Sequence, residues 1–274
     1  TSKTWGQYYY NAEKDLANFH LLGNPFTFNM DMSKLNSFGM VNGYAVVNAN
    51  GEYEYKTDGI VNVGDGFFVK VKENYATLTY DHSYVAPVLR GSAKANSINI
   101  IASGKAGKDN VIVNFAGKAE GFNKLQNFND AIATVYVSEN GKHYGIANVD
   151  ENTTEVALNF NAKEMGNYSI SLDVNGEFEE VTLVDRFTGI ETNMLLEDEY
   201  TFTASGNDNA NRFVIKLDNG QQTTANSQFV YQSGEELILS IEGSVQIVDM
   251  LGRVVYSNEH ANGNNRISVS EFNN

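Results

Sequence analysis

Few side chains in this 274-residue sequence have the type and spacing of a reaction centre. The four histidines fall in four different neighbourhoods, without metal-ligand spacing and without a glutamate paired to any of them. Since catalytic zinc typically needs three protein ligands, we expect each histidine to be a surface or strand residue. The histidines are His20, His82, His143 and His260.

Nucleophilic and carboxylate catalysis have no better support. No Gly-x-Ser-x-Gly elbow is present to position a nucleophilic serine. A pair of acids that converges only in space, as in glycosidases, leaves no trace in the spacing along the chain. The sequence therefore predicts no catalytic residue and no cofactor.

Two glycine-containing segments have part of the glycine spacing of nucleotide-binding loops. Residues 64–69 (Gly-Asp-Gly-Phe-Phe-Val) have Val69 where a dinucleotide-binding loop needs its third glycine, and no helical pattern follows. Residues 102–109 (Ala-Ser-Gly-Lys-Ala-Gly-Lys-Asp) have alanine in place of the first glycine and aspartate after the lysine. We expect the first segment to be a turn that enters a core strand and the second not to hold a phosphate.

Calcium is the one inorganic ligand that the sequence supports at all. Hard cations bind carboxylate, amide and backbone oxygens, which are present in residues 205–211 (Ser-Gly-Asn-Asp-Asn-Ala-Asn) and 173–177 (Asp-Val-Asn-Gly-Glu). Neither segment has the full spacing of an EF-hand loop, and turns use the same residues for backbone reasons. We favour ordinary turns and predict no metal ligand.

Aromatic residues are plentiful, with 15 tyrosines and 16 phenylalanines. Their flat apolar faces suit stacking on sugar rings, and Tyr8, Tyr9, Tyr10, Tyr53 and Tyr55 are the candidates. The competing interpretation, which we favour, is that alternate members are core residues and the others lie on the sheet surface.

An excess of acidic residues limits the partners of the chain. There are 34 acidic and 19 basic residues, which give a formal charge of -15. Nucleic acid and anionic lipid bind clustered Lys and Arg, so we expect no nucleic-acid partner. No apolar run approaches the roughly 18 to 20 residues of a membrane span. The first residues lack the basic and apolar regions of a signal peptide, and we interpret the chain as the C-terminal part of a longer or processed polypeptide.

Apolar residues recur with period two along the chain, which predicts strands with one buried face. Turn dipeptides punctuate this pattern, and Asn50-Gly51, Asn140-Gly141 and Asn175-Gly176 fit primed hairpin turns. Helical periodicity is confined to residues 11–18, 30–36 and 122–130. Frequent turns between short strands predict an all-β protein, built from tandem antiparallel β-sandwiches of the jelly-roll or immunoglobulin-like type. The clearest strand positions are Val111, Val113 and Phe115; Val156, Leu158 and Phe160; Tyr168, Ile170, Leu172 and Val174; and Phe213, Ile215 and Leu217.

Shifts in composition divide the chain into three segments. Strand patterning stops around residues 84–96, and residues 218–227 (Asp-Asn-Gly-Gln-Gln-Thr-Thr-Ala-Asn-Ser) form the clearest linker because they are almost free of apolar side chains. We expect a β-domain over 1–88, either complete or the C-terminal part of a larger sandwich. A β-sandwich over 89–217 and a small domain over 228–274 follow, with a domain break within 218–228.

Residues 245–256 (Val-Gln-Ile-Val-Asp-Met-Leu-Gly-Arg-Val-Val-Tyr) consist of two short apolar strands around a Met-Leu-Gly-Arg turn, and residues 229–241 supply a preceding strand pair. This pattern resembles the type A C-terminal sorting domain of proteins that Bacteroidetes export by the type IX secretion system. The resemblance implies a small immunoglobulin-like β-sandwich that is read at the outer membrane. The sorting-motif residues that it identifies are Val245, Ile247, Asp249, Leu251, Gly252, Arg253, Val254 and Tyr256.

Weaker resemblances cover the two upstream segments. Residues 22–26 (Leu-Gly-Asn-Pro-Phe) and 64–69 resemble a module of Bacteroidetes surface proteins in which a Gly-Asn-Pro turn opens a β-domain and a Gly-x-Gly-Phe-Phe-Val strand lies in its core. Residues 109–113, 200–202 and 211–215 resemble the β-sandwich that commonly follows this module. The sorting family usually continues past Asn274 with a further strand, so we expect a sandwich that ends there to expose an edge.

The leading hypothesis is a non-catalytic region of an exported surface protein, located at the cell surface or secreted, with the type IX export machinery as partner. Its upstream β-domains then serve as spacer, adhesion or interaction domains for a protein or glycan ligand. The alternatives are a polysaccharide-binding module and the accessory tail of a larger secreted hydrolase.

A geometric prediction follows for the C-terminal segment. Leu237, Leu239 and Ile241 are expected to point inward from one strand. Val245 and Ile247 are expected to pair across the turn with Val254 and Tyr256, while Asp249 and Arg253 stay in solvent. We expect the turn to need a positive φ at Gly252, because this conformation costs residues other than glycine about 1 kcal/mol or more.

Overall fold

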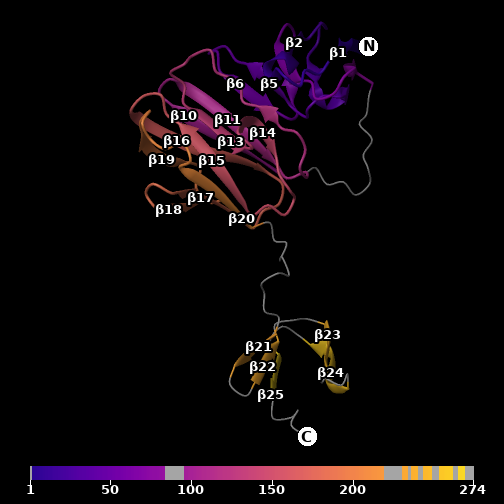
Figure 1. Ribbon diagram of the computed structural model, residues 1–274, viewed down its shortest axis with the longest axis vertical. Coiled ribbons are helices and arrows are strands. Elements are labelled where there is room, and N and C mark those ends of the chain that lie inside the picture. The colour runs from indigo at the N-terminus through magenta and orange to yellow at the C-terminus, as the bar shows by residue number, and fades with distance from the viewer. Residues whose placement is uncertain are drawn as a thin grey trace. The chain divides into compact units, whose positions relative to one another are not determined.

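The computed structural model describes residues 2–83, 96–218, 230–233, 236–239, 243–248, 253–261 and 265–268. Strands make up 55% of the chain and helices 3%, so the prediction of an all-β protein is confirmed. The chain divides into two compact units between Gly220 and Gln221, inside the interval predicted for the domain break. Figure 1 shows the strands of both units.

Residues 2–83 build a small lobe of three sheets, here called the N-terminal lobe. One sheet has the order β2-β8-β5-β6, another has the order β1-β9-β4, and in the third β3 pairs with β7. Its strands are β1 (Ser2–Tyr8), β2 (Phe19–Gly23), β3 (Met30–Asp31), β4 (Leu35–Phe38), β5 (Tyr44–Val47), β6 (Tyr53–Lys56), β7 (Ile60–Val61), β8 (Gly66–Lys70) and β9 (Ala76–Asp81).

Strand β8 shows how the four-stranded sheet uses both of its faces. Successive side chains of a strand point to opposite sides. Phe67 and Val69 accordingly enter the core of the N-terminal lobe, while Phe68 packs against a second apolar cluster shared with the rest of the unit. Lys70 has the parity of Phe68, so it lies on the shared face rather than in the N-terminal core.

Residues 96–218 form the second part of this unit, here called the central lobe. An 11-stranded sheet has the order β18-β17-β20-β15-β13-β14-β11-β10-β16-β19, with β12 paired to β14. Its pairs are antiparallel except β11 with β14. The strands are β10 (Ser97–Gly104), β11 (Gly107–Asn114), β12 (Phe122–Asn123), β13 (Thr134–Glu139), β14 (Lys142–Asn148), β15 (Glu155–Asn161), β16 (Gly166–Asn175), β17 (Glu180–Asp185), β18 (Ile190–Asn193), β19 (Tyr200–Ala204) and β20 (Phe213–Asp218).

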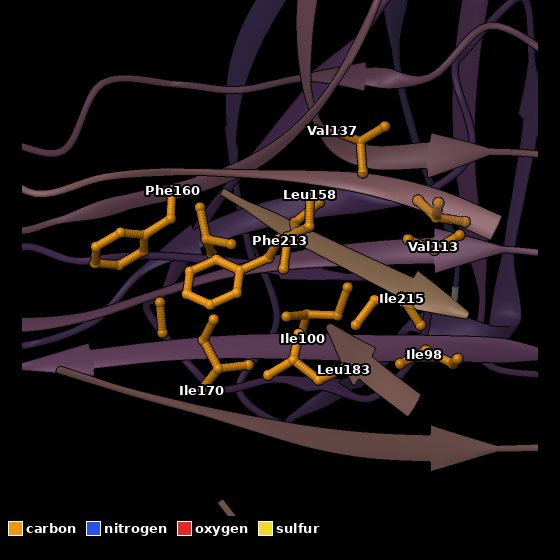
Figure 2. Packing of buried hydrophobic residues seen from close by; sticks show 14 of the residues in the cluster. Ile98, Ile100, Val113, Val137, Leu158, Phe160, Ile170, Leu183, Phe213 and Ile215 are labelled. Atoms are coloured by element: carbon orange, nitrogen blue, oxygen red, sulfur yellow. The ribbon is translucent and has the colours of Figure 1, made fainter. Parts of the chain in front are cut away.

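The long sheet curls around one apolar core. Side chains from β10 and β16 meet those from β15, β17 and β20 (Figure 2). Among the predicted strand positions, Leu172 and Val174 are only partly buried. The others are buried, as period two predicts: Val111, Val113, Phe115, Val156, Leu158, Phe160, Tyr168, Ile170, Phe213, Ile215 and Leu217.

The three predicted hairpin turns have different outcomes. Asn140 and Gly141 both have positive φ, 50° and 76°, and close the β13–β14 hairpin as a primed turn. Asn50-Gly51 lies in a longer loop in which only Gly51 has positive φ. The hairpin prediction is wrong for Asn175-Gly176, because β16 and β17 are not neighbours in the sheet.

Helical structure is as sparse as expected in the part of the chain that the structure describes. Two 3-10 turns, η1 (Asp15–Asn18) and η2 (Met32–Lys34), lie inside the first two predicted segments. The third segment, 122–130, begins instead with strand β12, which pairs with β14.

The N-terminal and central lobes share an apolar cluster and belong to one compact unit. Tyr55 of β6 packs there with Phe122 and Ile146 of the central lobe. A Cβ at Gly145 would overlap the Tyr55 ring, and one at Gly43 would overlap Ile146. The boundary expected between residues 88 and 89 lies outside the described residues, and the separate character of these two segments stays a prediction.

The C-terminal unit, Gln221–Asn274, contains two antiparallel sheets among its described residues. One sheet has the order β21-β22-β25, and the other is the pair β23-β24. The strands are β21 (Val230–Ser233), β22 (Glu236–Leu239), β23 (Gly243–Val248), β24 (Val254–Ala261) and β25 (Asn265–Ser268).

Candidate functional site

The predicted sorting motif coincides with the β23–β24 hairpin. Ile247 pairs with Tyr256, and Val245 pairs with Asn258. The register shifts between Ile247 and Val248, so that Val248 faces Val254. The two predicted strands therefore do pair, and the partner predicted for Ile247 is confirmed. The pairing predicted between Val245 and Val254 is wrong, because the register shift leaves an extra residue, Val255, on β24 as a bulge and moves each partner along the strand.

Side chains next to this turn combine apolar and charged character. Ile247 and Tyr256 face each other and are half-buried. Val254 is 54% exposed and Val255 39% exposed, and Arg253 is exposed as predicted. Exposed β-branched residues beside a guanidinium form a surface that a partner protein can bind.

Several predicted positions lie outside the described residues. They are the turn residues Asp249, Leu251 and Gly252, together with Ile241. For Leu237 and Leu239 the strand is described but the side chains are not. The predicted inward alternation and the conformation of Gly252 therefore stay predictions.

In the candidate calcium loop, residues 205–211, the Asp208 carboxylate is bonded to another residue of the same loop. Asp208 accepts hydrogen bonds of 2.9 Å from the backbone N–H and the hydroxyl of Ser205. These bonds hold the pKa of Asp208 below its usual value. In the other segment, the Asn175 side-chain amide donates to the Ser97 hydroxyl at 3.4 Å. Among the described residues, no three acidic or histidine side chains converge on a metal position.

The three histidines with described side chains lie in separate places, on β2, on β14 and just after β9, and contact aromatic rings. His20 packs on Tyr8, with ring centroids 4.3 Å apart, and burial lowers its pKa. His143 packs on Tyr136 at 4.2 Å. His82 lies 5.2 Å from the Phe28 ring. The side chain of His260 is outside the described part.

The first glycine-containing segment has the backbone role that we predicted, and the second lies in a hairpin. Gly64, with φ of 82°, forms a turn that leads into β8, whose Phe67 is fully buried. Residues 102–109 form the end of the β10–β11 hairpin, in which Gly104 pairs with Gly107. Neither segment precedes a helix, so neither has the helix N-terminus that a phosphate-binding loop uses.

The aromatic candidates for sugar stacking separate into two groups. Tyr53 and Tyr55 are 7% and 2% exposed and pack in the shared cluster, so sugar stacking on this pair is ruled out. Tyr9 is 60% exposed and lies edge-on to Tyr75, which is also 60% exposed, with ring centroids 5.4 Å apart. Tyr75 has a φ of 62°, which is unfavourable for a bulky residue.

Polar side chains at the junction of the two lobes were not singled out from the sequence. Asn110 of β11 accepts from the Tyr55 N–H at 3.0 Å and donates to the Tyr55 carbonyl at 3.1 Å, as a neighbouring strand would. Asn127 accepts from the Tyr53 N–H at 2.9 Å. Side-chain amides thus occupy the backbone groups of the edge strand β6, which would otherwise be open to pairing.

Two buried lysines lie at the same junction. Lys124 forms an ion pair of 2.8 Å with Asp109 and donates to the Asn110 carbonyl at 2.6 Å. Burial lowers the pKa of Lys124 despite the opposing effect of Asp109, and its ammonium lies 4.4 Å from the Tyr55 ring centroid. The second buried lysine is Lys70 of β8. The sequence gives little indication that Lys70 and Lys124 are buried, because the residues that each lysine contacts are distant from it in the sequence.

A cleft of about 310 Å³ lies where β6 faces β10 and β11. Glu52 on its wall accepts from the Lys108 N–H at 2.7 Å, and Asn110 donates to the Asn99 side chain at 2.7 Å. The Glu52 bond crosses the junction and the Asn110 bond joins two strands of the central lobe, so these polar groups are bonded within the protein, which favours a structural role for the cleft.

A bidentate ion pair between Arg212 and Asp185 lies where β17 ends and β20 begins in the central lobe. Arg212 donates to both carboxylate oxygens of Asp185, at 2.9 and 2.6 Å, and to the Thr203 carbonyl at 2.7 Å. Burial alone would raise the pKa of Asp185, but the hydrogen bonds from Arg212, Phe187 and Tyr200 outweigh it and leave the pKa below its ordinary value.

Comparisons of this chain with protein-family models, with curated proteins and with solved structures find no match. Within the described ranges, no helix has the length and apolarity needed to cross a membrane. The assignment of a function therefore rests on the residues of this chain itself.

Proposed function

We propose that this chain is a non-catalytic region of an exported cell-surface protein and that its C-terminal unit is a type IX sorting and anchoring module. The N-terminal and central lobes then serve as spacer, adhesion or interaction domains. In this proposal the β23–β24 hairpin is the element that the export machinery contacts.

The observation that carries the proposal is the hairpin itself, located in a compact unit of its own. An export label must be recognisable whatever cargo precedes it, and a unit that makes its own sheets meets this requirement. Exposed Arg253, Val254 and Val255 lie next to the turn and supply a contact surface.

The hydrogen bonds and ion pairs of the buried acidic side chains support the proposal that the chain is non-catalytic. Asp185 is bonded to Arg212, Asp109 to Lys124, and Glu52 to the backbone of Lys108. Groups engaged in this way stabilise the fold and are not positioned to exchange protons with a substrate.

A reporter fusion tests whether the unit is sufficient for sorting. The segment from residue 221, completed by its natural C-terminal residues, is joined to a periplasmic reporter in a type IX-competent host, and the reporter at the cell surface is measured. Surface display of the fusion and its absence for the reporter alone are expected. Arg253→Ala is expected to reduce display. Ser257→Ala, at an exposed position of β24 outside the motif, is expected to leave display unchanged.

Gly252→Val adds a second variant within the turn. If the turn needs a positive φ, the substitution reduces display, because a β-branched residue rarely adopts that conformation. The melting temperature of each variant fusion is compared with that of the unmodified fusion, so that loss of recognition is distinguished from loss of folding. Display equal to the unmodified fusion for both Arg253→Ala and Gly252→Val would contradict recognition through this turn.

Glycan binding is a second candidate function, which the exposed Tyr9–Tyr75 pair favours. Two rings held edge to face in solvent offer a stacking platform. Affinity electrophoresis in soluble polysaccharides is the test, with Tyr9→Ala expected to abolish retardation and Leu196→Ala, at another exposed apolar side chain, expected to have no effect. Unretarded migration of the unmodified protein in all polysaccharides tried would count against this function.

A further inference from the structure

A second polar cluster lies where β8 meets the central lobe. The ammonium nitrogen of Lys70 is 2.8 Å from a carboxylate oxygen of Glu120 and 3.3 Å from one of Asp15. The same nitrogen is in close contact with the side-chain amide oxygen of Asn123. The Lys70 side chain has no exposed surface, so these three groups take the place of water around it.

Strands hold Lys70 and Asn123, whereas Glu120 lies in the loop before β12, where its backbone carbonyl accepts a hydrogen bond of 3.1 Å from the Asn148 side chain. Lys70 belongs to β8 in the four-stranded sheet, and Asn123 belongs to β12, where it pairs with Tyr144 of β14. The Phe19 and Phe122 rings, 5.2 Å apart, line the apolar side of the cluster, and the Phe19 centroid is 5.9 Å from the Lys70 nitrogen. The amine of Lys70, whose side chain has no exposed surface, is thus kept in contact with an amide carbonyl, as intramolecular reactions require.

The other buried lysine makes a useful contrast. Lys124 meets a carboxylate, a backbone carbonyl and an aromatic ring, but among the contacts of the described residues it has no side-chain amide. Lys70 meets a side-chain amide and, separately, a carboxylate that can carry a proton. Of these two lysines, Lys70 is the one whose contacts with described residues combine a nucleophile, an electrophile and a proton carrier.

We propose that Lys70 and Asn123 form an intramolecular isopeptide bond that links the N-terminal lobe to the central lobe, with Glu120 as the proton carrier. This cross-link is independent of the sorting function proposed for the C-terminal unit.

The reaction exchanges one amide for another. The Glu120 carboxylate takes a proton from the Lys70 ammonium, and the freed nitrogen lone pair attacks the side-chain carbonyl carbon of Asn123. The resulting tetrahedral centre expels the amide nitrogen, which receives the proton held by Glu120. A new C–N bond forms, the old C–N bond breaks, and ammonia leaves with the remaining amine proton as ammonium. No oxidant, reductant or metal is needed.

Such a bond would be a covalent cross-link in a chain that cannot form a disulfide. The sequence contains no cysteine, so no disulfide can join the two lobes. A covalent link between residues 53 positions apart restricts the unfolded chain in the way a disulfide does. Reducing agents do not break it.

Intact-mass spectrometry of the purified, denatured full chain is the test. The unmodified protein is expected to be lighter than its sequence by one ammonia, and a tryptic digest is expected to contain a branched peptide that joins Lys70 to Asn123. Lys70→Arg, Asn123→Ala and Glu120→Gln are each expected to restore the full mass. The matched control Lys124→Arg, at the other buried lysine, keeps the ammonia loss.

Two results would overturn the proposal. An unmodified protein at its full sequence mass would mean that Lys70 makes only a non-covalent contact. Loss of ammonia that persists in Lys70→Arg, without a branched peptide, would mean that Asn123 or another asparagine has cyclised by itself. The first result needs no variant, so the proposal can fail even if a substitution prevents folding.

Discussion

At the scale of single residues, charges inside the central lobe are stable because each has a defined partner. Asp185 and Arg212 are 0% and 5% exposed and bind each other through two hydrogen bonds. The Arg212 guanidinium also lies 4.7 Å from the Phe202 ring and 5.1 Å from the Phe213 ring. Removing one partner leaves the other charged, buried and unpaired, which is costly.

Asp185→Asn is expected to lower the free energy of unfolding by about 3 to 5 kcal/mol, the range typical for breaking a buried ion pair. Urea denaturation followed by circular dichroism measures the loss. Lys216→Ala removes an exposed pair with Glu191 of 2.7 Å, and exposed pairs contribute little to stability because water screens them. Equal losses in the two variants would contradict the structural role of the buried pair.

The pH dependence of this pair has a definite sign. The pKa of Asp185 is lower in the folded protein than its ordinary value, so the unfolded state binds its proton more readily. The contribution of the pair is therefore complete above about pH 4, the ordinary aspartate value, and is lost as the pH falls through the folded pKa. The difference in unfolding free energy between the unmodified protein and Asp185→Asn is expected to shrink below about pH 4. A difference that grows on acidification would refute this assignment.

At the scale of elements, strand positions could be predicted because period two leaves a direct trace in the sequence. The turn Asn140-Gly141 was also predictable, since both residues tolerate positive φ. Asn175-Gly176 has the same local chemistry, but tertiary pairing sends β17 to β18 and β20 instead of back along β16. Local sequence specifies that a turn occurs, and the sheet decides which strands the turn connects.

The close approach of β14 to Tyr55 of β6 gives a prediction about a single glycine. Gly145→Ala is expected to destabilise the protein by about 1 to 3 kcal/mol, because the added methyl overlaps the buried Tyr55 ring and forces a shift. Gly6→Ala is the control, since nothing lies within 4 Å of its Cβ position. Thermal melting of both variants checks the difference, and an unchanged melting temperature for Gly145→Ala would contradict the described packing.

At the scale of the whole molecule, the chain consists of two compact units, and the first contains two lobes with a shared core. The polar linker at 218–227 made the break between the units predictable. The junction of the lobes was not, because Lys70, Asp109 and Lys124 acquire their partners only when distant strands meet. A sequence pattern identifies which face of a strand is apolar, but not which polar residues become buried against another lobe.

Residues 1–220 alone are expected to unfold in one cooperative transition, at a melting temperature within a few degrees of the same transition in the full chain. The shared cluster couples the two lobes, while the C-terminal unit makes its own sheets. Differential scanning calorimetry of the two proteins measures this. Two separate transitions within residues 1–220 would mean that the lobes fold independently.

The central claim concerns the C-terminal unit and is tested most directly by deletion. Residues 228–274 are removed from the chain in a type IX-competent host, and the protein at the cell surface is quantified by its accessibility to added protease. We predict that surface protein is lost while the remaining residues, 1–227, accumulate in the periplasm as a folded protein. Export equal to that of the full chain would contradict the account and make the segment an ordinary immunoglobulin-like domain.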